Sequence, residues 1–422
     1  MAPAVPRICC LDLDTFFVSV ERLLDPSLEG KAVVVGASKG QRGVVTAASY
    51  EVRRFGVRSG MPMADAVRRA PDAIFLPTRH NTYSPYAKRV REVLERFCPE
   101  VRTASIDEFF LDFRGCERLY RRFGDADGDA TIERVVHEMR RAIKRETGLP
   151  ASAGIGASRP VAKIASGLAK PAGVVLVPVG REREVLGPLP VRKYPGIGPV
   201  MEERLLRAGL ETLSQLVELP AGELRARFGG VAQRVRAGLE PNARVQLGRD
   251  RPAFLEHDQP QGGAVGSISN ERTFHADVGD IQRVLDQLRT LTERVCWRAR
   301  QRGVRARTVT LKLRFSNFHT VTRSMTDRPS HVEAQVLRRV RELFQRAQVL
   351  ALPVRLVGVQ LSNLVPDAPQ LELPLGPDQP APVGDALDAV RDRFGYDAIR
   401  LGVAGSKTRW LATPSEAVVA AG

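Results

Sequence analysis

Short apolar runs and segments of helical periodicity alternate along the first half of the chain. The apolar runs predict strands over residues 7–12, 31–35, 101–106 and 109–113. Apolar residues at helical spacing predict helices over residues 14–24, 47–55, 82–97 and 130–146. Asp14 has the residue type and position of an N-cap, and Gly56 would end the second helix. Strands that alternate with helices in this way predict an α/β or α+β fold.

The second half of the chain contains a turn-rich helical segment, a linker and a proline-rich tail. Residues 191–216 predict two short helices joined by tight glycine turns, and residues 249–263 have the composition of a linker. Six prolines between residues 365 and 385 predict an extended tail. A short amphipathic helix follows the tail, with an apolar face formed by Leu387, Val390 and Phe394.

The clearest strand of the chain covers residues 308–315. Its side chains alternate strictly in character: Val309, Leu311, Leu313 and Phe315 point one way, and Thr310, Lys312 and Arg314 point the other way. This alternation predicts a sheet with one buried face and one basic face.

Length and composition exclude several classes of protein. At about 100–200 residues per domain, 422 residues suggest two to four domains. No apolar run approaches the roughly 18–20 residues of a membrane span, and the first residues lack the apolar segment of a signal peptide. The five cysteines include no Cys-x-x-Cys pair, which favours reduced cytosolic thiols over disulfides or a zinc site.

Basic charge is concentrated in one part of the chain. The 64 Lys and Arg outnumber the 48 Asp and Glu, so the formal net charge is +16. Residues 264–364 hold 18 basic and 8 acidic residues, whereas the residues after them hold 5 and 8. A localised excess favours a surface that binds nucleic acid. The alternative is a solvated basic surface from a GC-rich genome, because only nine of the 64 cations are Lys.

Acidic residues stand at the ends of predicted strands. Asp12 ends the first strand, and Asp107 and Glu108 lie between two later ones. Side chains alternate along a straight strand, so a tight hairpin is needed for Asp107 and Glu108 to project from one end of the sheet. If the first strand lies alongside, three carboxylates come close together and repel unless cations neutralise them. This pattern predicts two Mg²⁺ ions that clamp the oxygens of an in-line phosphoryl displacement. For any one of these acids alone, a solvated or capping role is the commoner alternative.

Four long motifs surround these acids in a fixed order. They are LDLDTFFVSVE (residues 11–21), VTAASYEVRRFGVRSGMP (45–62), SIDEFFLD (105–112) and GIGASRPVAKIASGLAKP (154–171). Together they resemble the Y-family of DNA polymerases, of the bacterial DNA polymerase IV type. The resemblance extends from about residue 6 to residue 365.

The resemblance implies an α+β multidomain fold arranged as a right hand. A palm, with a ferredoxin-like sheet and helices, would cover residues 1–17 and 80–173, and small fingers would cover residues 18–79. A helical thumb with a helix-hairpin-helix would cover residues 174–248, followed by a linker at 249–264. An α+β little finger that binds DNA would cover residues 265–365, and a tail would cover residues 366–422.

The resemblance also implies the catalytic site. Asp12, Asp107 and Glu108 match the catalytic, metal-binding carboxylates of the family, and Leu13 matches the residue whose backbone carbonyl binds the nucleotide-side metal. Two Mg²⁺ ions are therefore expected, for which Mn²⁺ could substitute. Asp14 lies outside this set and keeps its expected role as a helix cap.

Residues that contact the incoming nucleotide follow from the same motifs. Thr46, Tyr50, Arg53 and Lys163 match the family's triphosphate contacts, and their side chains can all meet phosphate oxygens. If the four motifs did not match in order, a solvated surface role would be the better interpretation for Arg53 and Lys163. Phe17 matches the steric gate, an aromatic ring beneath the sugar that leaves no room for a 2′-hydroxyl. Phe16 faces another way and is expected to be a core residue.

The remaining implied sites contact DNA and a protein partner. Gly196 and Gly198 match the glycine turn of a helix-hairpin-helix, whose backbone N–H groups hold a phosphate. Lys312 and Arg314 lie on the expected basic face of the little finger. The segment Gln370, Leu371, Leu373 and Leu375 resembles the short peptide (370–375) that binds the sliding clamp, although Pro374 departs from the commoner form that ends in an aromatic residue.

The implied function is template-directed DNA synthesis of low fidelity that copies damaged templates. A dNTP would be added to a primer 3′-hydroxyl with release of pyrophosphate. The expected partners are primer-template DNA, dNTPs and the sliding clamp (its β subunit), with no membrane contact, and a monomer in the bacterial cytoplasm at the nucleoid is expected. One alternative is a catalytically silent homologue that acts as a DNA-binding scaffold, and the retained acids weigh against it. Another is a palm-type nucleotidyl cyclase, which would need neither the glycine hairpin nor the basic domain.

Overall fold

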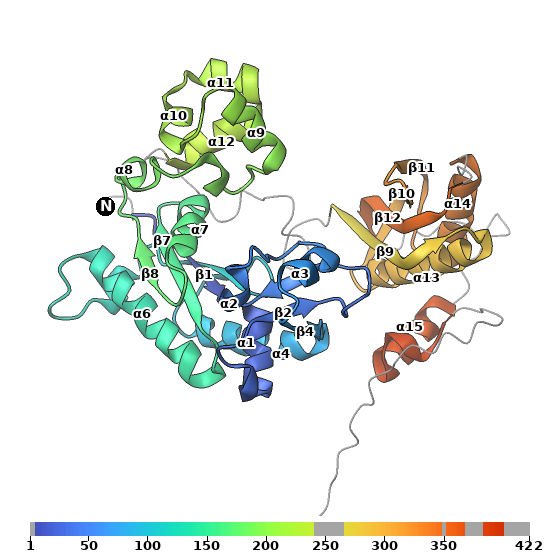
Figure 1. Ribbon diagram of the computed structural model, residues 1–422, viewed down its shortest axis with the longest axis horizontal. Helices are drawn as coiled ribbons and strands as arrows, with labels where there is room; N and C mark the ends of the chain where they lie inside the picture. Colours follow the sequence, from blue (N-terminus) through green and yellow to red (C-terminus); the bar gives the residue numbers. More distant parts are fainter. Residues whose placement is uncertain (1–4, 240–265, 348–351, 368–382, 401–422) are drawn as a thin grey trace, which may run out of the picture. The chain divides into compact units, whose positions relative to one another are not determined.

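The computed structural model describes residues 5–239, 266–347, 352–367 and 383–400, shown as ribbons in Figure 1. The chain divides into two compact units, Met1–His257 and Asp258–Gly422, which are treated separately below. None of the described helices is both long enough and apolar enough to cross a membrane.

A five-stranded sheet in the order β5-β6-β1-β7-β8 forms the centre of the first unit. Its middle strand, β1 (Ile8–Leu13), runs antiparallel to β6 (Glu108–Asp112) and β7 (Ala151–Gly156). The edge strands are β5 (Val101–Thr103), antiparallel to β6, and β8 (Val174–Leu176), parallel to β7. The strands predicted at the start of the chain and on both sides of Asp107 are confirmed, with their ends displaced by a few residues.

The alternation of side chains along β1 separates two environments. Cys9, Leu11 and Leu13 enter the main core, together with α1 (Phe16–Leu24), α4 (His80–Glu95) and α6 (Gly128–Thr147). Ile8 and Cys10 belong to a smaller cluster on the opposite face, which includes Ala162 of α7 (Arg159–Leu168). Asp12 follows in the same alternation and therefore lies on the α7 face.

Helix α7 lies unusually close to the sheet. A Cβ atom on Gly154 of β7 would lie 2.0 Å from the backbone nitrogen of Ser166 and 2.2 Å from the carbonyl oxygen of Ala162. The strand therefore needs glycine at this position so that the helix backbone can approach. The other side of α7 contributes Val161 and Ile164 to the core of the next helical cluster. Helix α7 is thus fixed from two sides above the end of β1.

A second, three-stranded sheet in the order β3-β2-β4 follows α1 and the short 3-10 turn Pro26–Leu28. Its elements are β2 (Val33–Gly36), β3 (Val45–Ala48), α2 (Tyr50–Arg53), α3 (Met63–Arg69) and β4 (Ile74–Pro77). The predicted helix over residues 47–55 is wrong at its start. Ala47 and Ala48 pair with β2, and the helix begins only after Ser49, whose side chain caps it by accepting from the Val52 N–H.

Residues after β8 form a small helical cluster with its own core. It contains α8 (Glu182–Leu186), the 3-10 turn Val191–Lys193, α9 (Pro199–Arg207), α10 (Leu213–Glu218), α11 (Ala221–Phe228) and α12 (Gly230–Leu239). Tyr194 and Ile197 are buried in this core on either side of Gly196. The predicted pair of short helices joined by a glycine turn is present. Helix α5 (Glu117–Tyr120) completes the first unit.

The second unit is an antiparallel sheet in the order β11-β10-β12-β9, with helices on one face (Figure 1). Its elements are β9 (Ser267–Val278), α13 (Ile281–Arg300), β10 (Val304–Phe315), β11 (Thr320–Ser330), α14 (Glu333–Arg346) and β12 (Val354–Pro366). The predicted alternation along residues 308–315 is confirmed. Four apolar side chains of β10 enter the core with α13 and α14, whereas Thr310, Lys312 and Arg314 lie on the other face and are half-buried.

The amphipathic helix predicted near the C-terminus is α15 (Val383–Phe394), followed by the 3-10 turn Tyr396–Ala398. Leu387 is buried as predicted, but Phe394 is 66% exposed. The helix docks through charges instead, because Arg391 is fully buried and pairs with Glu293 of α13 at 3.4 Å and with Asp388 at 3.7 Å. The predicted linker (249–264) and clamp peptide (370–375) lie outside the described residues.

Candidate active site

Two of the three predicted catalytic acids face each other across neighbouring strands. Asp12 of β1 and Glu108 of β6 are register partners, and both lie on the α7 face of the sheet. Asp107 stands one residue before β6, and its carbonyl oxygen accepts a hydrogen bond from the Leu13 N–H at 2.9 Å. The structure therefore brings the backbones of Asp12, Leu13, Asp107 and Glu108 together at one end of the sheet.

Two lysines of the fourth motif neutralise this acidic cluster. Lys163 of α7 forms an ion pair with Glu108, and Lys170, just after α7, forms one with Asp12. The family resemblance implies a triphosphate contact for Lys163 and no role for Lys170, although Lys170 lies within the same motif. The side chain of Asp107 instead accepts a hydrogen bond from Ser105.

The charges of the cluster perturb each other. Burial raises the pKa of Asp12 to about 6, with the Lys170 ammonium acting against the shift and the charges of Asp107 and Glu108 adding to it. Burial lowers the pKa of Lys163, but the Glu108 carboxylate outweighs this effect and leaves that pKa raised. Asp12 is therefore close enough to Asp107 and Glu108 to be repelled by both.

The donor set at this end of the sheet fits hard divalent cations. Mg²⁺ takes oxygen ligands and is usually held by one or two carboxylates together with substrate phosphates. Within the described residues, no three His, Cys, Asp or Glu side chains already surround a common point suited to a metal ion. The ammonium groups of Lys163 and Lys170 supply positive charge to Glu108 and Asp12 instead. Carboxylates that repel each other and attract ammonium groups have the chemistry of a cation site.

Asp14 does not cap the first helix, so that prediction is wrong. The N-cap residue of α1 is Thr15, which has left-handed backbone geometry and no side-chain cap. Asp14 is 1% exposed, and its carboxylate accepts hydrogen bonds from Ser152 Oγ at 2.9 Å, the Ala172 N–H at 2.8 Å and the Tyr50 hydroxyl at 3.1 Å. Local sequence indicated a cap, but partners remote in the chain hold this side chain in the interior.

The predicted triphosphate contacts other than Lys163 lie on β3 and α2. The Thr46 hydroxyl donates to the Val35 carbonyl oxygen at 2.9 Å. Arg53 donates to the Ala48 carbonyl oxygen at 3.1 Å, and its guanidinium lies 4.7 Å from the centre of the Tyr50 ring. Burial and the neighbouring Asp14 raise the pKa of Tyr50. The phenol is therefore a neutral donor, and Asp14 is its present acceptor.

The predicted steric gate, Phe17, is a half-buried ring at the start of α1. It stacks on Tyr83 of α4 with 4.2 Å between ring centres and 18° between planes. His80 meets its edge at 6.0 Å. Phe16 is 3% exposed, which confirms the expectation of a core residue.

Two further predicted sites are backbone and surface features. Gly196 has φ +96°, a left-handed geometry that favours glycine, and Gly198 immediately precedes α9. In the second unit, Lys312 pairs with Glu271 at 2.8 Å across Gly358 of β12. A Cβ on Gly358 would lie 2.8 Å from Glu271 Cγ, so glycine leaves room for this bridge. Arg314 donates to the Thr320 hydroxyl at 2.9 Å.

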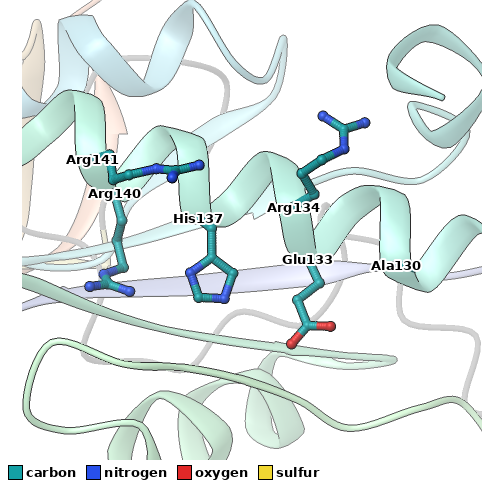
Figure 2. A pocket seen from close by; sticks show the side chains of 6 residues that line it. All are labelled: Ala130, Glu133, Arg134, His137, Arg140 and Arg141. Carbon is teal, nitrogen blue, oxygen red and sulfur yellow. The ribbon is translucent and has the colours of Figure 1, made fainter. Parts of the chain in front are cut away.

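An open recess of about 530 Å³ lies along α6 (Figure 2). All of its lining side chains come from that one helix, and none is a predicted site residue. Arg134 in its lining is already engaged by Asp125 at 2.8 Å and by Glu138 at 3.3 Å. The recess is a helix surface and does not reach the acidic cluster.

Comparison with protein families matches three parts of the chain. Residues 11–167 match the impB/mucB/samB family, residues 265–373 match the C-terminal domain of that family, and residues 179–210 match its helix-hairpin-helix motif.

Individual relatives and solved structures extend the likeness over most of the chain. A DNA polymerase IV of Dehalococcoides mccartyi (strain CBDB1) is 35% identical over 408 residues, 94% of this chain and 97% of that protein. A DNA polymerase IV of Streptomyces coelicolor is 39% identical over 361 residues, 85% of this chain and 71% of that protein. A Y-family DNA polymerase chimera has a similar fold, with a TM-score of 0.69 at 23% identity over 85% of this chain and 99% of the other.

Proposed function

This chain belongs to the impB/mucB/samB family and to the DNA polymerase IV type of Y-family polymerases, and on that premise we propose that it copies damaged DNA templates with low fidelity. It is a DNA-directed DNA polymerase. One observation supports the chemistry most directly: Asp12 and Glu108 are register partners on adjacent strands, and the backbone carbonyl of Asp107 accepts a hydrogen bond from the Leu13 N–H.

The proposed reaction is nucleotidyl transfer. The primer 3′-oxygen attacks the α-phosphorus of a dNTP, the bond to the β-phosphate oxygen breaks, and pyrophosphate leaves. Asp12, Asp107, Glu108 and the Leu13 carbonyl would hold two Mg²⁺ ions, for which Mn²⁺ could substitute. The chemistry that such ions supply is a lower pKa for the 3′-hydroxyl and neutralisation of charge on the leaving group.

The nucleotide would lie between the acidic end of the large sheet and the β3–α2 segment. Thr46, Tyr50 and Arg53 would bind its phosphates from one side, and Lys163 from the other. Lys163 would then exchange Glu108 for a phosphate oxygen, because an ammonium group forms its strongest hydrogen bonds with anionic acceptors. Phe17 would lie against the sugar and exclude a 2′-hydroxyl.

The DNA would be held by features that carry no sequence information. The Gly196–Gly198 turn offers backbone N–H groups at the start of α9, and Lys312 and Arg314 offer cations on the open face of the second sheet. We assign the domains as the sequence motifs imply: palm 1–17 and 80–173, fingers 18–79, thumb 174–248 and little finger 265–365. Binding of residues 370–375 to a sliding clamp and action as a monomer are parts of the proposal that rest on the sequence alone.

Primer extension tests the proposal. Purified protein with Mg²⁺, dNTPs and a primer-template should extend the primer according to the template, opposite both normal and damaged bases. Asp107→Ala should lower the extension rate by about a thousandfold or more, because metal clamping supplies several kcal/mol of transition-state stabilisation. Asp65→Ala is the matched control, since Asp65 is a surface carboxylate on α3 that pairs with Arg68.

The outcomes separate the proposal from its alternatives. DNA binding without synthesis by the wild-type protein would favour a catalytically silent scaffold. Pyrophosphate release from a nucleotide without primer or template would favour a cyclase. Equal loss of activity in Asp107→Ala and Asp65→Ala would remove the assigned role of Asp107.

A further inference from the structure

The ring at the predicted steric gate has a rigid support behind it. Phe17 stacks face to face on Tyr83, and Tyr83 is fully buried. Phe16 meets both rings, at 5.5 Å from Phe17 and 6.4 Å from Tyr83. The face of Phe17 that contacts Tyr83 therefore has no room to move back into the protein.

A buried carboxylate fixes the supporting ring from its far end. The Tyr83 hydroxyl donates to Glu21 Oε1 at 2.6 Å, and its oxygen accepts from the Arg79 N–H at 3.2 Å. Glu21 is only 3% exposed, and its second oxygen is paired with the Arg79 guanidinium. The ring of Tyr83 is thus held by stacking on its face and by two hydrogen bonds at its hydroxyl.

The helical spacing of α1 links this carboxylate to the gate. Phe17 and Glu21 are four residues apart, so they lie on the same face of the helix, one turn from each other. Both point toward the N-terminal turn of α4, which carries Tyr83 and follows Arg79. Tyr83 of α4 therefore contacts α1 at two points: its ring stacks on Phe17, and its hydroxyl donates to the Glu21 carboxylate.

A steric gate works only when its ring cannot retreat. Excluding a single hydroxyl requires that the ring keep its place to within about 0.5 Å, because a displacement of about 1 Å is enough to loosen a site. Aromatic stacking alone allows one ring to slide on another, since offset arrangements are similar in energy. A hydrogen bond to a buried charge removes that freedom from the supporting ring.

We propose that Glu21 and Tyr83 are positioning residues for sugar selection, which hold the ring of Phe17 in the place where it excludes a ribonucleotide. This inference rests on the proposed function, in which Phe17 contacts the sugar of the incoming nucleotide. Neither Glu21 nor Tyr83 needs to touch the nucleotide. Their contribution is the stiffness of the wall behind Phe17.

The experiment measures kcat/KM for insertion of one dNTP and of the matching rNTP opposite the same template base. Tyr83→Phe keeps the stacked ring and removes only its hydroxyl, and Glu21→Gln keeps the shape of the side chain and removes its charge. Each variant should lower the dNTP-to-rNTP selectivity by about tenfold, the rate equivalent of one hydrogen bond to a buried charged group. This loss of selectivity should come mainly from a higher kcat/KM for the rNTP, with a smaller change in kcat/KM for the dNTP.

Tyr120→Phe is the matched control. The Tyr120 hydroxyl donates to the Phe97 carbonyl oxygen at 2.9 Å, in the same core but away from Phe17. This variant loses one hydrogen bond by the same substitution, and it should leave selectivity unchanged. A merely structural role for Glu21 and Tyr83 would lower dNTP and rNTP insertion together, keep their ratio and thereby overturn the inference.

A double-mutant cycle tests whether the effect passes through Phe17. In a Phe17→Ala background, Tyr83→Phe should cause no further loss of selectivity, because the ring that it supports is gone. An additive loss would show that Tyr83 acts on the nucleotide by another route and would refute the positioning role. Normal selectivity in Phe17→Ala itself would refute both the gate and its support, whereas a wild-type protein without template-directed dNTP insertion would refute the proposed function.

Discussion

The ion pair between Lys312 and Glu271 gives a quantitative test of the DNA-binding surface. Lys312 is one of the two cations assigned to the duplex, yet Glu271 holds its ammonium through both carboxylate oxygens at 2.8 Å. A phosphate that binds this lysine must compete with Glu271 for its charge, because the carboxylate already takes two of the three N–H donors of the ammonium group. Glu271→Gln removes the competing charge and leaves the lysine, the sheet and the glycine beneath the bridge in place.

The size of the effect follows from the exposure of the pair. The side chains of Lys312 and Glu271 are 30% and 41% exposed, and ion pairs this accessible contribute about 0.2–1 kcal/mol. Removing Glu271 should therefore raise duplex affinity by up to about fivefold. If Lys312 then neutralises one more phosphate, the slope of log K against log salt should steepen by about 0.9. Folding stability should change by less than about 1 kcal/mol.

Fluorescence anisotropy of a labelled primer-template over a series of salt concentrations measures both quantities. Glu342→Gln is the control, because Glu342 is an exposed carboxylate on α14 that pairs with Arg346 within the same helix. Both variants change the net charge by the same amount, but only Glu271→Gln releases Lys312. Equal shifts in affinity and salt slope for the two variants would show that overall charge, rather than the open face of the sheet, governs binding.

Two further predictions concern packing. Gly154→Ala should lower the melting temperature by about 2 °C or more in a calorimetric scan, since overpacking against the backbone of Ser166 costs about 1–3 kcal/mol. Gly167→Ala on α7 is its control: the added Cβ meets nothing within 4 Å, so this variant should be neutral or stabilising. Arg391→Met should detach α15 from α13, because removing one partner of a fully buried ion pair costs about 3–5 kcal/mol. This cost exceeds the stability of an isolated 12-residue helix, which is marginal in water. Limited proteolysis should then cut near the C-terminus, whereas Arg393→Met, which changes an exposed residue of the same helix, should leave the wild-type pattern.

Patterns that depend on local chemistry were predictable from the sequence. The alternation along β10 predicted both faces of its sheet, because the period of two leaves only one way to bury Val309, Leu311 and their neighbours. The helix over residues 47–55 was mispredicted because Ala47 and Ala48 are good helix formers in isolation. Their pairing with β2 overrides that preference, and the partner strand cannot be inferred from those residues.

In the candidate site, too, local patterns were predictable and contacts between remote segments were not. Asp12 and Glu108 could be placed together because both lie at strand ends within recognisable motifs. Asp14 could not be interpreted correctly, since its partner Ser152 lies 138 residues away in the chain and gives no local signal. The contact behind the role proposed for Tyr83 was equally hidden: Tyr83 belongs to none of the four motifs, and only the packing of α1 against α4 brings it to Phe17, the predicted steric gate.

The ion pairs of the free protein constrain how its substrates bind. Lys163 and Lys170 at present satisfy the charges of Glu108 and Asp12. A triphosphate alone could attract the lysines, but it would leave the carboxylates unpaired in a partly buried site, which is costly. Divalent cations alone would compete with the lysines for the carboxylates and leave the ammonium groups without partners. If both were bound together, each lysine would exchange its carboxylate for a phosphate and each carboxylate would exchange its ammonium group for a cation, so that no charge would be left unpaired. On the proposed function, this exchange would favour the nucleotide–metal complex over either component, whereas the two ion pairs themselves stabilise the site before any substrate enters.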